Sequence, residues 1–150
     1  MNPVPVLVVD DHQRYRELFC QLLSDCFPNL QLATAADGSE ALRLTEQTSF
    51  ALVLLDYRLP WINGGDVVRQ LRARCQHRQV AAPPIVLTTS EPDGARFARI
   101  MGASAFLPKP TTAEDVRTII GPLLPQQAPS PDPARPKLWR IQPRPTPQES

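Results

Sequence analysis

Short apolar runs alternate along this chain with stretches in which apolar residues recur every three or four positions. The short runs are rich in Val, Ile and Leu and are long enough for buried strands. The run at 50–55 is almost entirely apolar, as expected of a strand that is covered on both faces. The pattern predicts five strands, at 4–9, 30–35, 50–55, 85–88 and 103–107.

Between these runs the apolar positions change to helical spacing. In the first such stretch Tyr15 begins an apolar face that continues for three turns. Asp37 or Ser39 can cap the second helix, and Thr111 or Thr112 the last one. The expected helices lie at 12–27, after 37–39, after 65, at 93–101 and from 111–112 to 121. Five strand–helix alternations predict a doubly wound parallel sheet with helices on both faces.

Polar residues stand where the predicted strands stop. Asp10 and Asp11 follow the first strand, Asp56 follows the third, Thr89 the fourth, and Lys109 comes shortly after the fifth. In a parallel sheet the carboxyl ends of all strands lie at the same edge, so these side chains could converge. Three carboxylates, a hydroxyl and an ammonium at one point would hold a divalent cation and a phosphoryl group.

The first loop excludes the common nucleotide-binding motifs. Asp10-Asp11-His12 stands where a dinucleotide-binding chain carries G-x-G-x-x-G, and no P-loop is present. Negative charge in this loop repels phosphate unless a cation intervenes, and oxygen ligands of this kind suit Mg²⁺. Lys109 strengthens that interpretation, because the chain uses Arg fourteen times and Lys twice, and a compact ammonium suits a crowded site better than a guanidinium.

The composition and net charge mainly exclude classes of binding partner. The net charge of +1 gives no electrostatic case for nucleic acid or a membrane surface, and no run of apolar residues is long enough to span a bilayer. The expected location is the cytoplasm. Cys20, Cys26 and Cys75 form no metal-binding motif and are expected to be reduced thiols in or near the core.

Proline content divides the chain. Nine of the eighteen prolines lie in 122–150, so we expect a folded domain at 1–124 and a Pro-rich flexible tail at 125–150. The tail is too short for a DNA-binding output domain. Its apolar spot, 138–141, is either a linker end, a patch folded back on the domain, or a docking peptide for a partner.

Taken in order, the motifs resemble the receiver domain of two-component response regulators, the fold of the chemotaxis response regulator. The resemblance covers about 4–122. It rests on Asp10-Asp11, Leu54-Leu55-Asp56, Leu59-Pro60, Asn63-Gly64, 84–90, 102–106 and Lys109-Pro110. It implies a flavodoxin-like five-stranded sheet in the order 2-1-3-4-5. The sequence Val-Val-Asp-Asp-His with Arg16 nearby resembles the branch of the family that usually has a helix-turn-helix output domain. Because the tail is too short for such a domain, this resemblance does not imply DNA binding.

The resemblance implies a role for each carboxylate. Asp56 is the phosphoacceptor, which takes a phosphoryl group from a histidine kinase or histidine phosphotransfer protein to give an acyl phosphate. Asp11 and Asp56 bind Mg²⁺ directly, Asp10 lies near it, and the backbone carbonyl of Arg58 completes the protein ligands. The protein is then no enzyme in the usual sense, because it catalyses only its own phosphorylation and dephosphorylation.

The remaining positions follow the same resemblance. Lys109 pairs with the phosphate oxygens, Thr89 donates its hydroxyl to the phosphate, and Phe106 turns inward when Thr89 moves. Thr88 is a rival to Thr89, although counting from Pro84 favours Thr89. Lys109-Pro110 is a place where the family often has a cis peptide.

Arg58 and Glu91 stand two residues after Asp56 and Thr89, where the family modulates phosphate lifetime. As a pair they could shield the acyl phosphate from water, or form an ordinary surface ion pair. Signalling is expected through an unknown downstream protein, with the last two helices and the fifth strand as the switch face and as the contact of a homodimer.

Simpler interpretations stand beside these. Asp10-Asp11 could cap the next helix, Gly64 is expected to need a positive φ, and Trp61 could lie open on the surface or pack on its own helix. The alternative function is a phosphorylation-independent interaction module with a receiver fold. An aspartate-nucleophile phosphatase is disfavoured, because that class needs an acid where this chain has Arg58.

Overall fold

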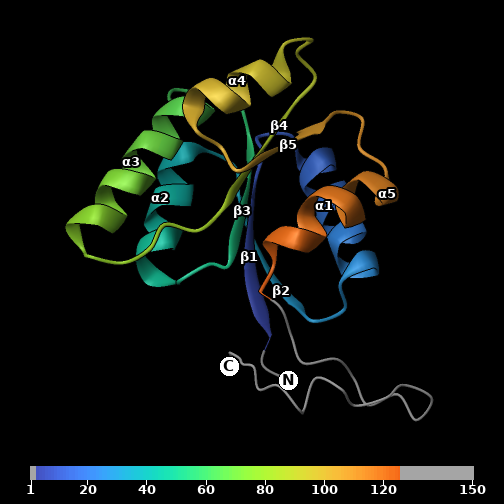
Figure 1. The fold of residues 1–150 in the computed structure, drawn as a ribbon, viewed down its shortest axis with the longest axis horizontal. Coiled ribbons are helices and arrows are strands. Elements are labelled where there is room, and N and C mark those ends of the chain that lie inside the picture. The colour runs from blue at the N-terminus through green and yellow to red at the C-terminus, as the bar shows by residue number, and fades with distance from the viewer. Residues whose placement is uncertain (1–2, 126–150) are drawn as a thin grey trace, which may run out of the picture.

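A parallel sheet divides the molecule into two helical layers, as the computed structural model shows (Figure 1). The structure describes residues 3–125, so the predictions made for the tail beyond Pro125 lie outside the described residues. The sheet has five strands in the order β2-β1-β3-β4-β5, as predicted. The strands are β1 (Val4–Val9), β2 (Leu30–Ala35), β3 (Leu52–Asp56), β4 (Ile85–Thr89) and β5 (Ala105–Pro108).

Helices follow the strands in alternation. They are α1 (Gln13–Cys26), α2 (Gly38–Gln47), α3 (Gly64–His77), α4 (Gly94–Met101) and α5 (Ala113–Asp115), the last continued by a π-helical turn, η1 (Val116–Ile120), and a 3₁₀ turn, η2 (Gly121–Leu123). No helix among residues 3–125 is long and apolar enough to cross a membrane.

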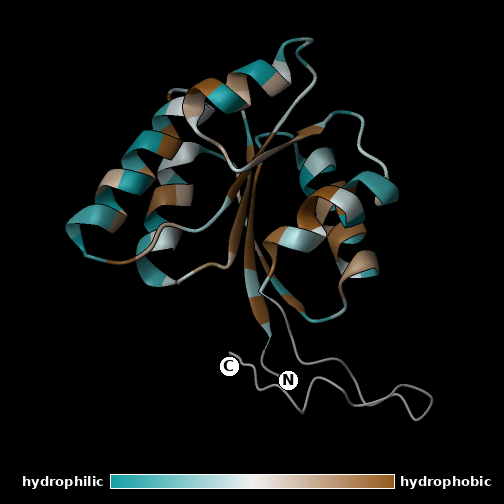
Figure 2. Cartoon of the chain, in the orientation of Figure 1, coloured by the Kyte–Doolittle hydropathy of each residue, from teal (hydrophilic) through white to brown (hydrophobic). Residues whose placement is uncertain are grey.

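Two apolar cores lie on the two faces of the sheet. Side chains of α2 and α3 pack on one face, and those of α1 and η1 pack on the other (Figure 1). The central strands alternate between these cores, so that Val53 and Leu55 join the first and Leu52 and Leu54 the second. Figure 2 shows the strands as predominantly hydrophobic, in keeping with a sheet that is covered on both faces.

Side-chain caps fix the starts of α2, α3 and α5. The Asp37 carboxylate, and not Ser39, accepts from the backbone N–H of Glu40 at 2.8 Å. Thr112, and not Thr111, caps α5 in a reciprocal capping box with Asp115. Asn63 caps α3, a role that the sequence interpretation did not assign.

The last predicted helix departs from a regular α-helix. Only Ala113–Asp115 is α-helical before the π-helical and 3₁₀ turns begin. Pro122 has no N–H for the carbonyl of Thr118, and its ring clashes with that carbonyl in an α-helix. The chain therefore changes its hydrogen-bond spacing as it approaches Pro122.

Candidate functional site

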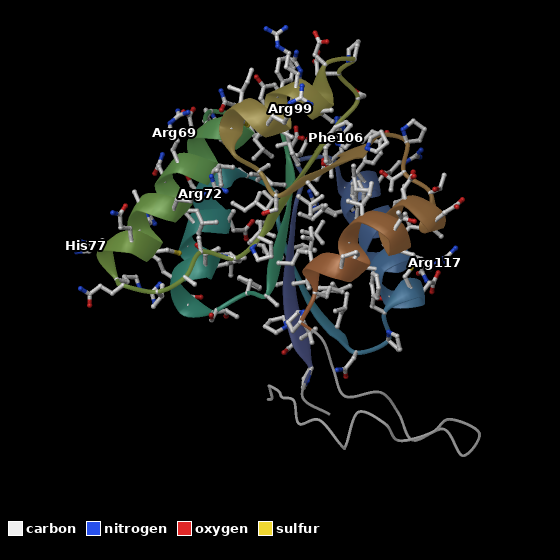
Figure 3. All side chains as sticks on the ribbon, viewed as in Figure 1. Arg69, Arg72, His77, Arg99, Phe106 and Arg117 are labelled. Atoms are coloured by element: carbon white, nitrogen blue, oxygen red, sulfur yellow. The ribbon has the colours of Figure 1, made fainter. Side chains whose placement is uncertain are left out.

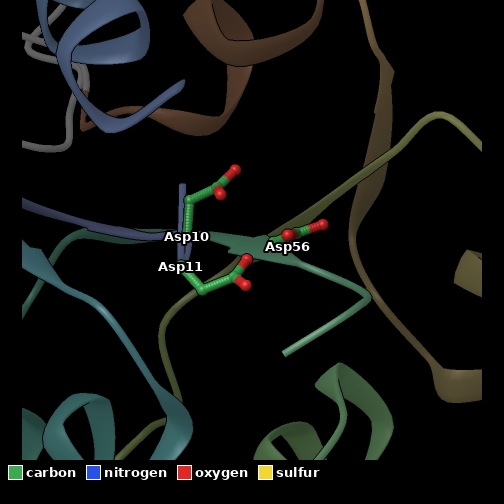
Figure 4. Close-up of side chains that lie close together, drawn as sticks. All are labelled: Asp10, Asp11 and Asp56. Carbon is green, nitrogen blue, oxygen red and sulfur yellow. The ribbon is translucent and has the colours of Figure 1, made fainter. Parts of the chain in front are cut away.

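Three carboxylates gather where β1 and β3 end. Asp56 is the last residue of β3, and Asp10 directly follows β1, which pairs with β3 up to Val9 and Leu55. Oxygen atoms of Asp10, Asp11 and Asp56 all lie within 4.8 Å of one another (Figure 4). Asp10 is 0% exposed and Asp56 is 4% exposed, whereas Asp11 faces solvent. Parallel register thus brings together acids that are 46 positions apart in the sequence.

Lys109 reaches into this cluster from the loop after β5. Its Nζ donates to Asp10 Oδ2 at 2.7 Å and lies 3.3 Å from Asp56 Oδ1. All three side chains are nearly inaccessible, so water does little to screen the ammonium from the two carboxylates. The peptide bond between Lys109 and Pro110 is cis, as the resemblance led us to expect.

Burial raises the pKa of Asp56 to about 6. The negative charge of Asp10 contributes to this rise, while Lys109 and the N–H of Arg58, 3.3 Å from Asp56 Oδ1, act in the opposite direction. One ammonium therefore does not fully compensate the carboxylates, and a further cation at this point would be stabilised.

Helix capping does not explain the acidic pair. The N-cap of α1 is His12, and no side chain caps it. The Asp10 carboxylate instead accepts from the N–H of His12 at 2.8 Å, and the Asp10 carbonyl accepts from Arg16 Nη1 at 2.8 Å. These bonds hold the first loop in place while leaving Asp10 Oδ2 to Lys109.

Thr89 ends β4 beside the carboxylates. It lines the same pocket as Asp56 and Lys109, whereas Thr88, its rival, does not. The Thr89 hydroxyl accepts from the N–H of Glu91 at 3.1 Å. Its backbone carbonyl accepts from the N–H of Lys109 at 3.1 Å, which ties the ends of β4 and β5 together.

Phe106 lies next to Thr89 at the start of α4. A Cβ built on Gly94 would come within 2.4 Å of the Phe106 ring and within 2.6 Å of the Thr89 methyl. Phe106 is half-buried, and Figure 3 places it near α4 at the end of the sheet that carries the site. Gly94 thus leaves room for the ring beside Thr89.

Arg58 and Glu91 form the predicted ion pair at the mouth of the pocket. Arg58 lines the pocket and its side chain is 70% exposed, so the pair is open to solvent. The role of the Arg58 backbone carbonyl as a metal ligand stays a prediction.

The backbone conformation tests the expectations for Gly64 and Trp61, which lie in and after the loop that follows β3. Gly64 does not have a positive φ; Gly102 is the only glycine of residues 3–125 that does. A Cβ on Gly64 would come within 3.0 Å of the Asp56 carbonyl and of Tyr57 Cα, so close packing against the end of β3 favours glycine here. Trp61 is 89% exposed with φ 67°, so it lies open on the surface.

The pocket itself has a volume of about 210 Å³. Its lining adds three residues that the sequence interpretation did not place in the site, namely His12, Tyr15 and Ser90. The Tyr15 ring lies under Lys109, with Nζ 4.2 Å from the ring centroid. Helical periodicity assigned Tyr15 to an apolar face, and only the position of Lys109 across the fold reveals this contact.

An acidic cluster, a lysine and a threonine thus lie together at the carboxyl edge of a doubly wound parallel sheet, as the resemblance to receiver domains implies. The family model for the response regulator receiver domain matches residues 6–121, and the chain belongs to this family. Receiver domains are signalling modules and not classical enzymes.

Relatives agree with that assignment. The chain is 35% identical over 137 residues to the response regulator MprA of Mycobacterium sp. (strain KMS), covering 91% of this chain and 57% of that protein. It thus spans little more than half the length of this relative. The solved structure of the chemotaxis response regulator CheY4 of Vibrio cholerae superposes with a TM-score of 0.70 at 28% identity, covering 82% of this chain and all of that one.

A third structure supports the fold alone. The receiver domain of Ssk1 from Saccharomyces cerevisiae, co-crystallised with the histidine phosphotransfer protein Ypd1, matches with a TM-score of 0.68 at 21% identity. It covers 77% of this chain and 84% of that one.

Proposed function

We propose that this receiver domain takes a phosphoryl group on Asp56 and signals by changing its protein contacts. The observation that carries the proposal is the position of the Asp56 carboxylate, 3.3 Å from the Lys109 ammonium and within 4.8 Å of Asp10 and Asp11. A buried nucleophile beside a cation and further carboxylates suits the transfer of a negatively charged group.

The oxygen ligands favour Mg²⁺ as the cofactor. Asp11 and Asp56 would hold the ion directly, with Asp10 close to it and the backbone carbonyl of Arg58 as a further ligand. The bound ion would supply positive charge that offsets the charge building on the transferred phosphoryl group. The uncompensated carboxylates fit a divalent cation in both charge and ligand type.

The reaction balances without a further co-reactant. An oxygen of the Asp56 carboxylate forms the new bond to phosphorus while the bond between phosphorus and the donor imidazole nitrogen breaks. The electron pair of that bond leaves with the imidazole. Lys109 would bind the transferred oxygens, and the Thr89 hydroxyl, which now accepts from Glu91, would turn to donate to the phosphate.

Movement of Thr89 would pass the signal to Phe106, whose ring lies beside the Thr89 methyl. We propose α4, β5 and α5 as the face that changes on phosphorylation, and as the contact surface for a downstream protein or a homodimer. The Arg58–Glu91 pair, of which Arg58 lines the pocket, would slow the entry of water and lengthen the life of the acyl phosphate.

The donor would be a histidine kinase or a histidine phosphotransfer protein, the latter being the class of protein with which the Ssk1 receiver domain was co-crystallised. Nucleic acid and membranes have no part in the proposal. A cytoplasmic location and a receiver domain at 1–124 followed by a Pro-rich segment at 125–150 stay predictions from the sequence.

One experiment separates this proposal from the phosphorylation-independent interaction module. The protein is incubated with a small acyl-phosphate donor, with Mg²⁺ or with a chelator, and its intact mass is measured. We expect one phosphoryl adduct in Mg²⁺ and none in chelator. An adduct that forms equally in both, or none with either the small donor or a histidine-phosphorylated donor protein, would contradict the proposal.

A further inference from the structure

Tyr15 of α1 forms the wall of the pocket behind Lys109. The Lys109 Nζ lies 4.2 Å from the centroid of the Tyr15 ring, within the range of a cation–π contact. The ring stacks on the buried Phe19 at a centroid distance of 6.1 Å, and His12 meets it edge-on at 6.3 Å. Neighbours on two sides thus fix the plane of the ring that faces the ammonium.

The other two partners of Lys109 are carboxylates that Mg²⁺ would also use. Nζ lies 2.7 Å from Asp10 and 3.3 Å from Asp56, and both acids belong to the cluster that could hold a metal ion. A divalent cation would compete for these oxygens and would repel the ammonium. Because the Lys109 side chain is only 7% exposed, water cannot readily replace the weakened contacts.

A bound metal ion would not compete for the contact between Lys109 and the Tyr15 ring. An aromatic face attracts a cation through its quadrupole, and it offers a hard divalent ion none of the oxygen ligands that Asp10 and Asp56 provide. We infer that Tyr15 is a positioning residue: its ring keeps the Lys109 ammonium at the pocket wall, facing Asp56, when a metal ion occupies the carboxylates. This inference rests on the proposed function, because it concerns the same phosphate-binding lysine.

The first test reads the contact without any phosphoryl donor. Ring currents from Tyr15 should move the NMR signals of the Lys109 side-chain methylene nearest Nζ upfield. We expect this shift in the wild type and in Tyr15→Phe, and its loss in Tyr15→Leu. Saturating Mg²⁺ should leave the upfield shift in place, and its disappearance on adding Mg²⁺ would overturn the inference.

The second test measures the rate constant of phosphorylation by a small acyl-phosphate donor at saturating Mg²⁺. Tyr15→Phe should match the wild type. Tyr15→Leu should be about three- to tenfold slower, the fold-change that corresponds to a contact of roughly 0.7 to 1.4 kcal/mol. If Tyr15→Leu folds poorly, Tyr15→Met supplies an unbranched apolar side chain at the same place.

A double-mutant cycle separates positioning from packing. Tyr15→Leu made in a Lys109→Met background should slow phosphorylation by less than twofold, since Tyr15 then has no ammonium to hold. An equal slowing in both backgrounds, or Tyr15→Leu phosphorylating as fast as the wild type, would overturn the inference. A wild type that takes no phosphoryl group would count against the proposed function, whereas the NMR test still decides whether Tyr15 holds Lys109.

Discussion

Lys109 lies closer to Asp10 than to Asp56, with Nζ 2.7 Å from the first carboxylate and 3.3 Å from the second. The lysine therefore pairs with both buried carboxylates and compensates part of the charge of the acidic cluster. Because all three side chains are buried, the free energy of unfolding and the affinity for Mg²⁺ should both depend on this one ammonium.

Replacing Lys109 by Met should destabilise the metal-free protein and strengthen Mg²⁺ binding. Removing one partner of a buried pair leaves uncompensated charge, for which we expect a loss of about 3 kcal/mol in the free energy of unfolding. Saturating Mg²⁺ should recover most of that loss. Denaturant unfolding with chelator or Mg²⁺, and calorimetric titration with Mg²⁺, measure both effects, and Lys109→Arg is the charge-conserving control. Weaker Mg²⁺ binding by Lys109→Met would contradict this account.

Replacing Asp56 by Asn should stabilise the metal-free protein above pH 6. Between pH 3.8, the ordinary pKa, and about 6, the raised pKa, the folded state keeps a proton that the unfolded state has lost. Rising pH therefore lowers the free energy of unfolding of the wild type across this window. Above about pH 6 the full loss of stability from ionising Asp56 is present. We expect Asp56→Asn to gain roughly 1 to 3 kcal/mol at pH 8 in chelator, and little below pH 4.

The same comparison in Mg²⁺ provides the control. A bound cation stabilises the ionised carboxylate, so the advantage of Asp56→Asn should shrink or reverse when Mg²⁺ is added. A gain in stability that is the same at low and high pH would mean that ionisation of Asp56 is not its cause.

Gly94→Ala should displace the Phe106 ring. The added Cβ would lie 2.4 Å from a ring carbon, so the ring or the start of α4 has to move. We expect a loss of about 1 to 3 kcal/mol, which is typical of overpacking. The loss should be smaller in a Phe106→Ala background, where only the contact with the Thr89 methyl at 2.6 Å remains. Gly65→Ala, whose Cβ would meet no atom closer than 3.2 Å, is the milder control. Equal costs in both Phe106 backgrounds would show that the ring does not occupy this space.

Breaking the Arg58–Glu91 pair should shorten the life of the acyl phosphate and leave folding almost unchanged. Arg58 is 70% exposed, so the pair should contribute no more than about 1 kcal/mol to stability. Glu91→Gln should increase the dephosphorylation rate severalfold, measured as the decay of the phosphorylated mass after donor removal. Asp66→Asn, which breaks an exposed pair with Arg69, is the control. Identical decay in both variants would rule out a shielding role.

Much of this site could be predicted from the sequence because parallel sheets obey a simple rule. Polar residues stand at or just after the ends of β1, β3, β4 and β5, and register brings Asp10, Asp56, Thr89 and Lys109 together whatever the details of packing. Counting from Pro84 to the family position favoured Thr89 over Thr88, and Thr89 is the one that lines the pocket.

Most of the features that the sequence interpretation missed depend on contacts between segments that are far apart in the sequence. Periodicity places Tyr15 on an apolar face but cannot tell that Lys109 lies over its ring. Gly64 is needed because the Asp56 carbonyl passes close to it, a contact between segments that local turn chemistry does not encode. The irregular end of the last helix depends on Pro122, which the sequence interpretation used only to end the helix.

The central claim is that Asp56 accepts the phosphoryl group. The most direct measurement treats the protein with a small acyl-phosphate donor and Mg²⁺, reduces the acyl phosphate with borohydride, and locates the resulting alcohol by peptide mass spectrometry. The account predicts the reduced residue at position 56 in the wild type and no labelled peptide in Asp56→Asn. Reduction at Asp10 or Asp11, or a label that persists in Asp56→Asn, would contradict it.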